Sequence, residues 1–212
     1  MSSQAMNIDD TIAALRVELQ EEHHCHTVIL YGSRAGDTAS EASDYDLAGF
    51  GDVAETRRLA RVRQDRFDDL FVYPQAYLAD PPLELLKLRG GVVLVERDGL
   101  GTALLARLEE RFRASPPKLP ADELEARRVW AGKMLERTKR GDAEGNYRRV
   151  WLLTALLEDY FQLRGLWFLG PTSALAWLRE HDPEASRAFE EGLRTEAGSE
   201  AIAALVRLVI GR

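Results

Sequence analysis

Residues 27–50 read TVILYGSRAGDTASEASDYDLAGF, and this stretch decides the fold. The apolar run at 27–31 predicts a strand that breaks at Gly32 and Ser33. A polar excursion follows, and then a second apolar run begins with DYDL at 44–47. Because side chains alternate along a strand, the two aspartates of DYDL are predicted to share one face, while its tyrosine and leucine point into a core.

The aspartate pair predicts a cation site. Asp44 and Asp46 on one strand face would repel each other unless a cation lies between them. Carboxylate oxygens suit Mg²⁺, which typically binds one or two carboxylates together with substrate phosphates. Upstream, Gly32 permits close backbone approach, and Ser33 supplies donors for a phosphate group. Together these features predict phosphoryl or nucleotidyl transfer.

The same residues resemble the signature of the nucleotidyltransferase superfamily that includes DNA polymerase β and kanamycin nucleotidyltransferase. That signature is an apolar residue, Gly, Gly or Ser, a short spacer, and an Asp-apolar-Asp/Glu-apolar group. Residues 31–33, the spacer 34–43 and DYDL at 44–47 satisfy each element. The GSRA and SDYDL sequences resemble the small bacterial branch with the aminoglycoside nucleotidyltransferases. Where that branch often has a second basic residue and a glycine, this chain has Gly36 and Asp37.

The resemblance implies a third carboxylate on a later strand. The β-rich run RFDDLFVY at 66–73, stopped by Pro74, contains Asp68 and Asp69. Only one of these neighbours can face the first pair, because adjacent strand residues point to opposite sides. We choose Asp69, since its following sequence looks more like the family's Asp-Leu-apolar strand. Asp68 would then be a solvated edge or turn residue.

The resemblance also implies a mechanism with two Mg²⁺ ions and an NTP, with ATP as the expected nucleotide. Asp44 and Asp46 would share the ion that bridges the triphosphate, and the ion near Asp69 would activate an acceptor hydroxyl. Ser33 and the N–H groups after Gly32 would hold the phosphates. Arg34 either adds positive charge there or lies on the surface of a following helix.

Composition limits the partners and the compartment. The 212 residues are 45% apolar and 30% charged, which is ordinary for a globular chain. The net charge of −7 argues against a long nucleic acid and is compatible with a small cationic acceptor. No apolar run approaches the ~20 residues of a membrane helix, and residues 1–6 lack a signal-peptide core. With the single cysteine, Cys25, this favours a cytoplasmic protein without a membrane partner; a homodimer is compatible with the sequence.

The pattern along the chain predicts an α+β fold. Strands are expected at 27–31, 44–50, 67–73 and 92–95, and helices at 8–23, 54–62, 83–88 and 102–113. We therefore expect a nucleotidyltransferase domain over 1–114, in which helices flank a small mixed β-sheet. The proline-rich segment 115–120 predicts a linker. An all-α helical-bundle domain is expected over 121–212, with helices at 121–140, 144–168, 173–180, 183–193 and 197–210.

One glutamate of the helical half is a candidate base. Glu158 and Asp159 interrupt a strongly apolar helix, where a carboxylate needs a partner or takes a raised pKa. In kanamycin-type enzymes a glutamate of the helical domain acts as the base, so the resemblance points to Glu158. The alternative is a solvent-facing Glu-Asp step on a buried helix.

The run HHCH at 23–26 invites a metal assignment. Adjacent residues cannot all reach one ion, and the sequence has no second ligand pair at zinc spacing. We interpret the run as a helix-to-strand junction.

The leading functional prediction is a Mg²⁺-dependent enzyme that moves a nucleoside monophosphate from an NTP to a hydroxyl of a small molecule and releases pyrophosphate. The family precedent for the acceptor is aminoglycoside-like. Two alternatives stay open: nucleotidylation of a protein partner, as in toxin–antitoxin pairs, and a degenerate domain that binds nucleotide without turnover.

Overall fold

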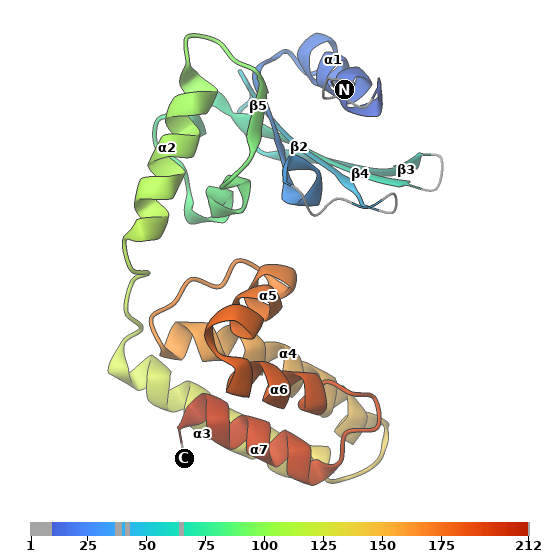
Figure 1. The fold of residues 1–212 in the computed structure, drawn as a ribbon, viewed down its shortest axis with the longest axis vertical. Coiled ribbons are helices and arrows are strands. Elements are labelled where there is room, and N and C mark those ends of the chain that lie inside the picture. Colours follow the sequence, from blue (N-terminus) through green and yellow to red (C-terminus); the bar gives the residue numbers. More distant parts are fainter. Residues whose placement is uncertain (1–9, 37–39, 41–42, 64–65, 212) are drawn as a thin grey trace, which may run out of the picture. The chain divides into compact units, whose positions relative to one another are not determined.

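The computed structural model describes residues 10–36, 40, 43–63 and 66–211. The chain divides into two compact units, Met1–Arg113 and Ala114–Arg212 (Figure 1). The first unit holds a five-stranded mixed sheet with flanking helices, and the second is all-helical. The predicted fold class is therefore confirmed.

The sheet of the first unit has the strand order β3-β4-β2-β1-β5. The only parallel pair among the described strands is β2 with β4; the other neighbours run antiparallel. The strands are β1 (Cys25–Tyr31), β2 (Tyr45–Gly51), β3 (Arg57–Arg63), β4 (Arg66–Pro74) and β5 (Val92–Val95). Four of the five were predicted, with ends within a few residues.

The edge strand β3 corrects one prediction, because a helix was expected over 54–62. Its sequence RRLARVR is rich in residues that favour helices, and this helix propensity led to the wrong prediction. Pairing with β4 along the whole strand overrides that preference. The strand also alternates: Leu59, Arg61 and Arg63 are half-buried, and the residues between them are exposed.

Helix α1 (Asp10–Glu21) covers one face of the sheet. Its buried residues Ile12, Leu15 and Leu19 join a core with the inward side chains of the strands: Cys25, Val28, Leu30, Tyr45, Leu47, Leu70 and Val72. This packing explains why the apolar half of DYDL points inward. The single cysteine lies here, and burial raises the pKa of its thiol to about 11.

The opposite face carries the aspartates and is only partly covered. Two 3-10 segments, η2 (Gln75–Leu78) and η3 (Leu83–Leu88), and helix α2 (Leu100–Arg113) pack at its β1 side. η3 was predicted as a short helix and forms with the tighter geometry. From η3, the Lys87 ammonium reaches the rings of Phe71 and Tyr31 on this face.

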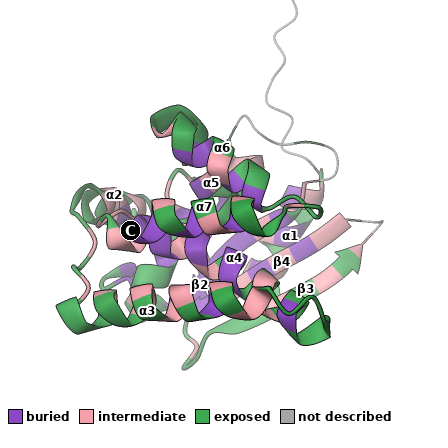
Figure 2. Ribbon diagram, turned by 90° about the horizontal axis from the view of Figure 1, so that it is seen from below, coloured by how far each residue is buried: buried purple, intermediate pink, exposed green. Residues whose placement is uncertain are grey.

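The second unit contains α3 (Ala121–Thr138), α4 (Ala143–Leu163), α5 (Pro171–His181), α6 (Pro183–Gly192) and α7 (Ser199–Ile210). Their apolar faces form one core, centred on α4 residues such as Leu152, Leu156 and Tyr160. Figure 2 shows buried stretches of α4 to α7 between exposed ones. No helix of the described part of the chain is long and apolar enough to cross a membrane.

Helix α4 is shorter than the predicted 144–168. It begins after Asp142, whose side chain accepts a hydrogen bond of 2.8 Å from the Gly145 N–H. It ends at Leu163, because Gly165 adopts a positive φ of 65° that a helix cannot continue. The segment 164–170, with its aromatic residues, is therefore a connection and not the end of the helix.

Candidate active site

The turn after β1 brings its backbone against Asp46. Gly32 has φ +72°, a conformation that favours glycine. A Cβ atom at Gly32 would lie 2.3 Å from Oδ2 of Asp46, so any other residue here would have to displace that carboxylate. Glycine therefore lets the short 3-10 turn η1 (Gly32–Ala35), with the half-buried Ser33, lie beside this carboxylate without displacing it.

The parallel pairing of β2 with β4 sets two aspartates side by side. Asp46 is the direct partner of Asp69, and Tyr45 is the partner of Asp68. Side chains of partnered residues share a face, so Asp46 and Asp69 point together and Asp68 points the other way. Asp44, exposed just before β2, has the parity of Asp46. These three aspartates are called the carboxylate site below.

The carboxylate site is short of positive charge at Asp46. The pKa of Asp46 is raised to about 6, first by burial and then by the negative charges of Asp69 and Asp44. Lys87 works in the opposite direction but does not cancel these effects. The raised proton affinity of Asp46 reflects an excess of negative charge around it. The same excess of negative charge would stabilise a bound divalent cation.

Two cationic side chains stand beside the site. Arg58 forms a two-bonded ion pair with Asp69, through Nε to Oδ1 at 2.7 Å and Nη2 to Oδ2 at 2.9 Å. The Lys87 ammonium lies 3.6 Å from the centre of the Phe71 ring, on the same face of the sheet. The pKa of Lys87 is lowered by burial, although Asp69 and other acids partly offset this effect.

Asp68 corrects a second prediction, because it is not solvated. It is fully buried, and its Oδ2 pairs with Nε of Arg61 at 3.1 Å and with Nε of Arg63 at 3.2 Å. Arg61 also donates to Glu18 of α1. The aspartate is therefore part of an ionic network that fastens β3 and β4 to α1.

Arg34 is engaged with the protein backbone. Its Nε and Nη2 donate to the carbonyl of Ser43, at 3.0 and 2.6 Å, and Nε also donates to that of Asp44 at 3.1 Å. The guanidinium lies 4.0 Å from the centre of the Tyr45 ring. Arg34 thus ties the Gly-Ser turn to the start of β2, although part of the spacer between them lies outside the described residues.

No family model matches the chain, and no curated protein sequence does. Among solved structures, a nucleotidyltransferase-like protein from Exiguobacterium sibiricum 255-15 is similar, with 17% identity and a TM-score of 0.42. The match covers 94% of this chain and 72% of that one. A likeness this weak carries no argument about function, which has to come from the site.

Glu158 lies on α4 in the second unit. It is half-buried, and its Oε1 accepts a hydrogen bond from Nε2 of Gln162. Its neighbour Asp159 is buried and pairs with Nη1 of Arg127 at 2.6 Å. Asp159 is therefore committed to a structural ion pair, and of the two only Glu158 has a surface through which it could meet a ligand.

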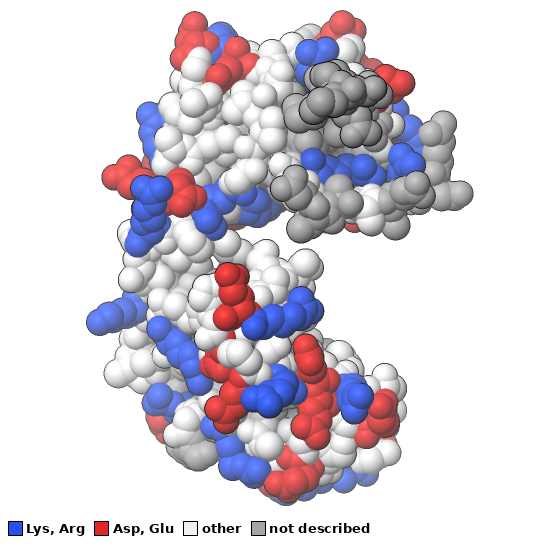
Figure 3. Space-filling view, viewed as in Figure 1, with Lys and Arg blue, Asp and Glu red and all other residues white. Residues whose placement is uncertain are grey.

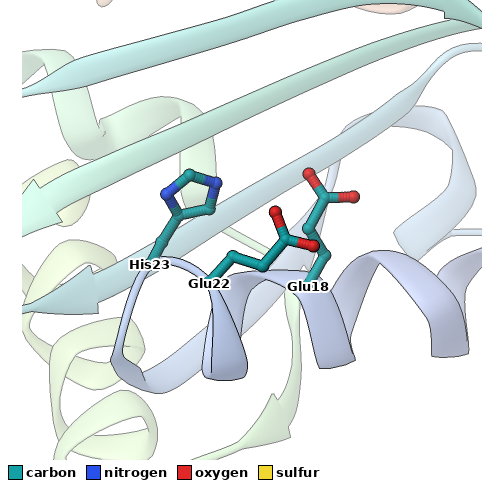
Figure 4. A group of neighbouring side chains, drawn as sticks. All are labelled: Glu18, Glu22 and His23. Carbon is teal, nitrogen blue, oxygen red and sulfur yellow. The ribbon is translucent and has the colours of Figure 1, made fainter.

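The HHCH run forms the junction between α1 and β1, as expected. Near it, Glu18, Glu22 and His23 bring potential ligand atoms within 4.8 Å of one another (Figure 4). Oε2 of Glu18, however, already accepts a 2.5 Å hydrogen bond from Nη2 of Arg61. Glu18 therefore already belongs to the ionic network that joins α1 to β3.

Basic side chains gather on β3; Arg58 pairs with Asp69 of the carboxylate site, whereas Arg61 and Arg63 pair with Asp68 on the other face of the sheet. Figure 3 shows Lys and Arg atoms over the β3–β4 side of the first unit, within a chain of net charge −7. The strand contributes Arg57, Arg58, Arg61 and Arg63.

Sequence reasoning missed Arg58 and Lys87. The signal for Arg58 was the alternation in RRLARVR, which is hidden once the segment is interpreted as a helix. Lys87 lies in a 3-10 turn far along the chain from the aspartates, so its sequence gave no sign that it lies near Phe71 and Asp69.

Proposed function

We propose that the protein is a Mg²⁺-dependent nucleotidyltransferase that moves a nucleoside monophosphate from an NTP, with ATP as the expected donor, to a hydroxyl of a small-molecule acceptor. The observation that carries the proposal is the pairing of Asp46 with Asp69 in register, directly against the backbone of Gly32. It combines a carboxylate site with a turn suited to phosphate.

The residues present fit the implied metal. The carboxylates of Asp44, Asp46 and Asp69 are hard oxygen ligands, and the raised pKa of Asp46 is consistent with a carboxylate that lacks a full counter-charge. When bound, Mg²⁺ ions would neutralise phosphate charge and lower the pKa of an acceptor hydroxyl. Two ions are proposed, because three carboxylates in this arrangement offer enough oxygens for two.

The chain's own groups would position the reactants. Ser33 and the N–H groups that follow Gly32 would donate to the terminal phosphates. Arg34 holds the start of β2 against the same turn, which keeps Asp44 and Asp46 in place for their task. The acceptor oxygen would form a bond to the α-phosphorus as the bond to the pyrophosphate oxygen breaks.

The acceptor must lose its proton during transfer. We propose Glu158 as the base that receives it, on the family precedent and because its carboxylate remains partly accessible. Asp69 is the alternative, since it would lie next to the same hydroxyl.

The test uses NTPs labelled at the α-phosphate, with amino alcohols, aminoglycosides and lysate proteins as acceptors. We expect label on a small molecule, with pyrophosphate release that requires Mg²⁺. Asp46→Asn should abolish both, whereas Asp52→Asn, an exposed aspartate just after β2, should retain them. Label on protein would favour the toxin–antitoxin alternative, and no Mg²⁺-dependent pyrophosphate release with any NTP would contradict the proposal.

A further inference from the structure

The Arg58–Asp69 pair has one exposed partner and one largely buried partner. The Arg58 side chain is 56% exposed, whereas that of Asp69 is 15% exposed. Both hydrogen bonds go to the two oxygens of one carboxylate, which is the strongest geometry for such a pair. Because Arg58 extends into water, it can release Asp69 without any change in the core.

In this ion pair the Arg58 guanidinium occupies the Asp69 carboxylate, which the proposed function needs as a metal ligand. The inference rests on that proposed function. A divalent cation at the carboxylate site and the guanidinium of Arg58 compete for the oxygens of Asp69. In addition, a positive charge this close weakens the binding of any cation by direct repulsion.

A released Arg58 would remain beside the site. Its Cα is partnered with Phe71, two residues along β4 from Asp69, and its guanidinium lies 5.5 Å from the centre of the Phe71 ring. The ring offers a second resting place for the cation on the same face of the sheet. The planar fork of arginine also suits two phosphate oxygens as well as it suits a carboxylate.

We propose that Arg58 exchanges partners during the binding of substrate. In the metal-free protein it holds Asp69 in place and neutralises its charge. When a divalent cation binds, Arg58 gives up Asp69, and its N–H groups donate to phosphate oxygens of the NTP. Arg58 therefore weakens metal binding to the empty protein and strengthens nucleotide binding to the metal-loaded protein.

Arg57 provides a matched control. It is the neighbouring residue of β3, is also exposed, and carries the same charge. Strand alternation points it to the other face, away from Asp69. Arg57→Ala and Arg58→Ala thus each remove one positive charge from the protein. They differ in the face of the sheet from which that charge is removed.

The experiment measures two affinities. Mn²⁺ binding to the nucleotide-free protein is followed by the electron paramagnetic resonance of the free ion, and binding of a non-hydrolysable ATP analogue by calorimetry in saturating Mn²⁺. For Arg58→Ala we expect Mn²⁺ to bind about threefold more tightly or better, and the analogue about tenfold more weakly. Arg57→Ala should leave both within about twofold of wild type.

The two changes of opposite sign distinguish this exchange from a structural role, which would lower both affinities. Arg58→Lys keeps the charge without the fork, so it should keep the wild-type Mn²⁺ affinity and still bind the analogue more weakly. If Arg58→Ala binds Mn²⁺ no tighter, or the analogue no more weakly, the exchange is wrong.

The controls separate this failure from that of the proposed function. If wild type binds Mn²⁺ and Asp46→Asn does not, the metal site stands and the Arg58 variants alone decide the inference. If wild type binds no Mn²⁺, the proposed function fails, and the exchange fails with it.

Discussion

At the scale of single residues, Asp46 should make the metal-free protein less stable as the pH rises. Its folded pKa of about 6 lies above its ordinary value of 3.8, so the fold disfavours the ionised form. The free-energy cost of ionised Asp46 to the folded state is absent below about pH 4, grows between pH 4 and 6, and is complete above pH 6. Without Mg²⁺, Asp46→Asn should therefore raise the free energy of unfolding by about 1 kcal/mol at pH 8, after allowance for solvent screening.

This gain should shrink toward zero at pH 4. Urea denaturation of the variant and wild type at both pH values measures it, and Asp52→Asn serves as the exposed control. An equal gain at both pH values would mean that ionisation of Asp46 is not its source.

Substitutions of Asp68 and Asp69 should affect different properties, namely stability for Asp68 and transfer activity for Asp69. Asp69→Asn should remove transfer and leave the protein folded, because Asp69 faces the carboxylate site. Asp68→Asn should cost about 2–3 kcal/mol of stability, because Arg61 and Arg63 lose their buried partner. Activity assays and denaturation of both variants at low temperature separate the effects. Full inactivity of a folded Asp68→Asn variant would contradict these roles.

At the scale of elements, the turn η1 should depend on one glycine. Gly32→Ala would place a Cβ on the Asp46 carboxylate and strain a left-handed backbone, so we expect a loss of about 1–2 kcal/mol and of metal binding. Gly36→Ala is the control, since nothing lies within 4 Å of its added Cβ. Denaturation and Mn²⁺ titration measure both variants. A Gly32→Ala variant that matched wild type would show that the close approach is not required.

The elements that sequence predicted are those set by local pattern. The strand before Gly32, the DYDL strand and the alternation that separates Asp68 from Asp69 all follow from neighbouring residues. By contrast, β3 has helix-favouring residues, and its pairing with β4 decides its conformation. The ion pairs of Arg58 and Arg61 depend on that pairing, so the local pattern could not reveal them. That the site binds metal and nucleotide stays a prediction.

At the scale of the whole molecule, nucleotide binding and transfer should respond differently to two substitutions. NTP with Mg²⁺ should stabilise the protein by mass action, and NTP with EDTA should stabilise it less. Asp46→Asn should erase this difference. Glu158→Gln should keep the thermal shift but lose transfer, because a base for the acceptor touches the nucleophile and not the triphosphate.

Glu191→Gln, an exposed glutamate on α6, is the control for this variant and should behave as wild type. Full activity of Glu158→Gln would make Glu158 an ordinary surface residue and move the search for the base to Asp69.

The single thiol of the chain, on the α1 side of the sheet, offers a way to measure how often the core of the first unit opens. Cys25 is 3% exposed and packs against Gly49, so an alkylating reagent can reach it only when this core opens. The chain has no other cysteine, and the rate of modification therefore reports the opening of one unit with no contribution from the second. If NTP and Mg²⁺ bind where we propose, they should slow this labelling, measured by mass spectrometry, in wild type and not in Asp46→Asn.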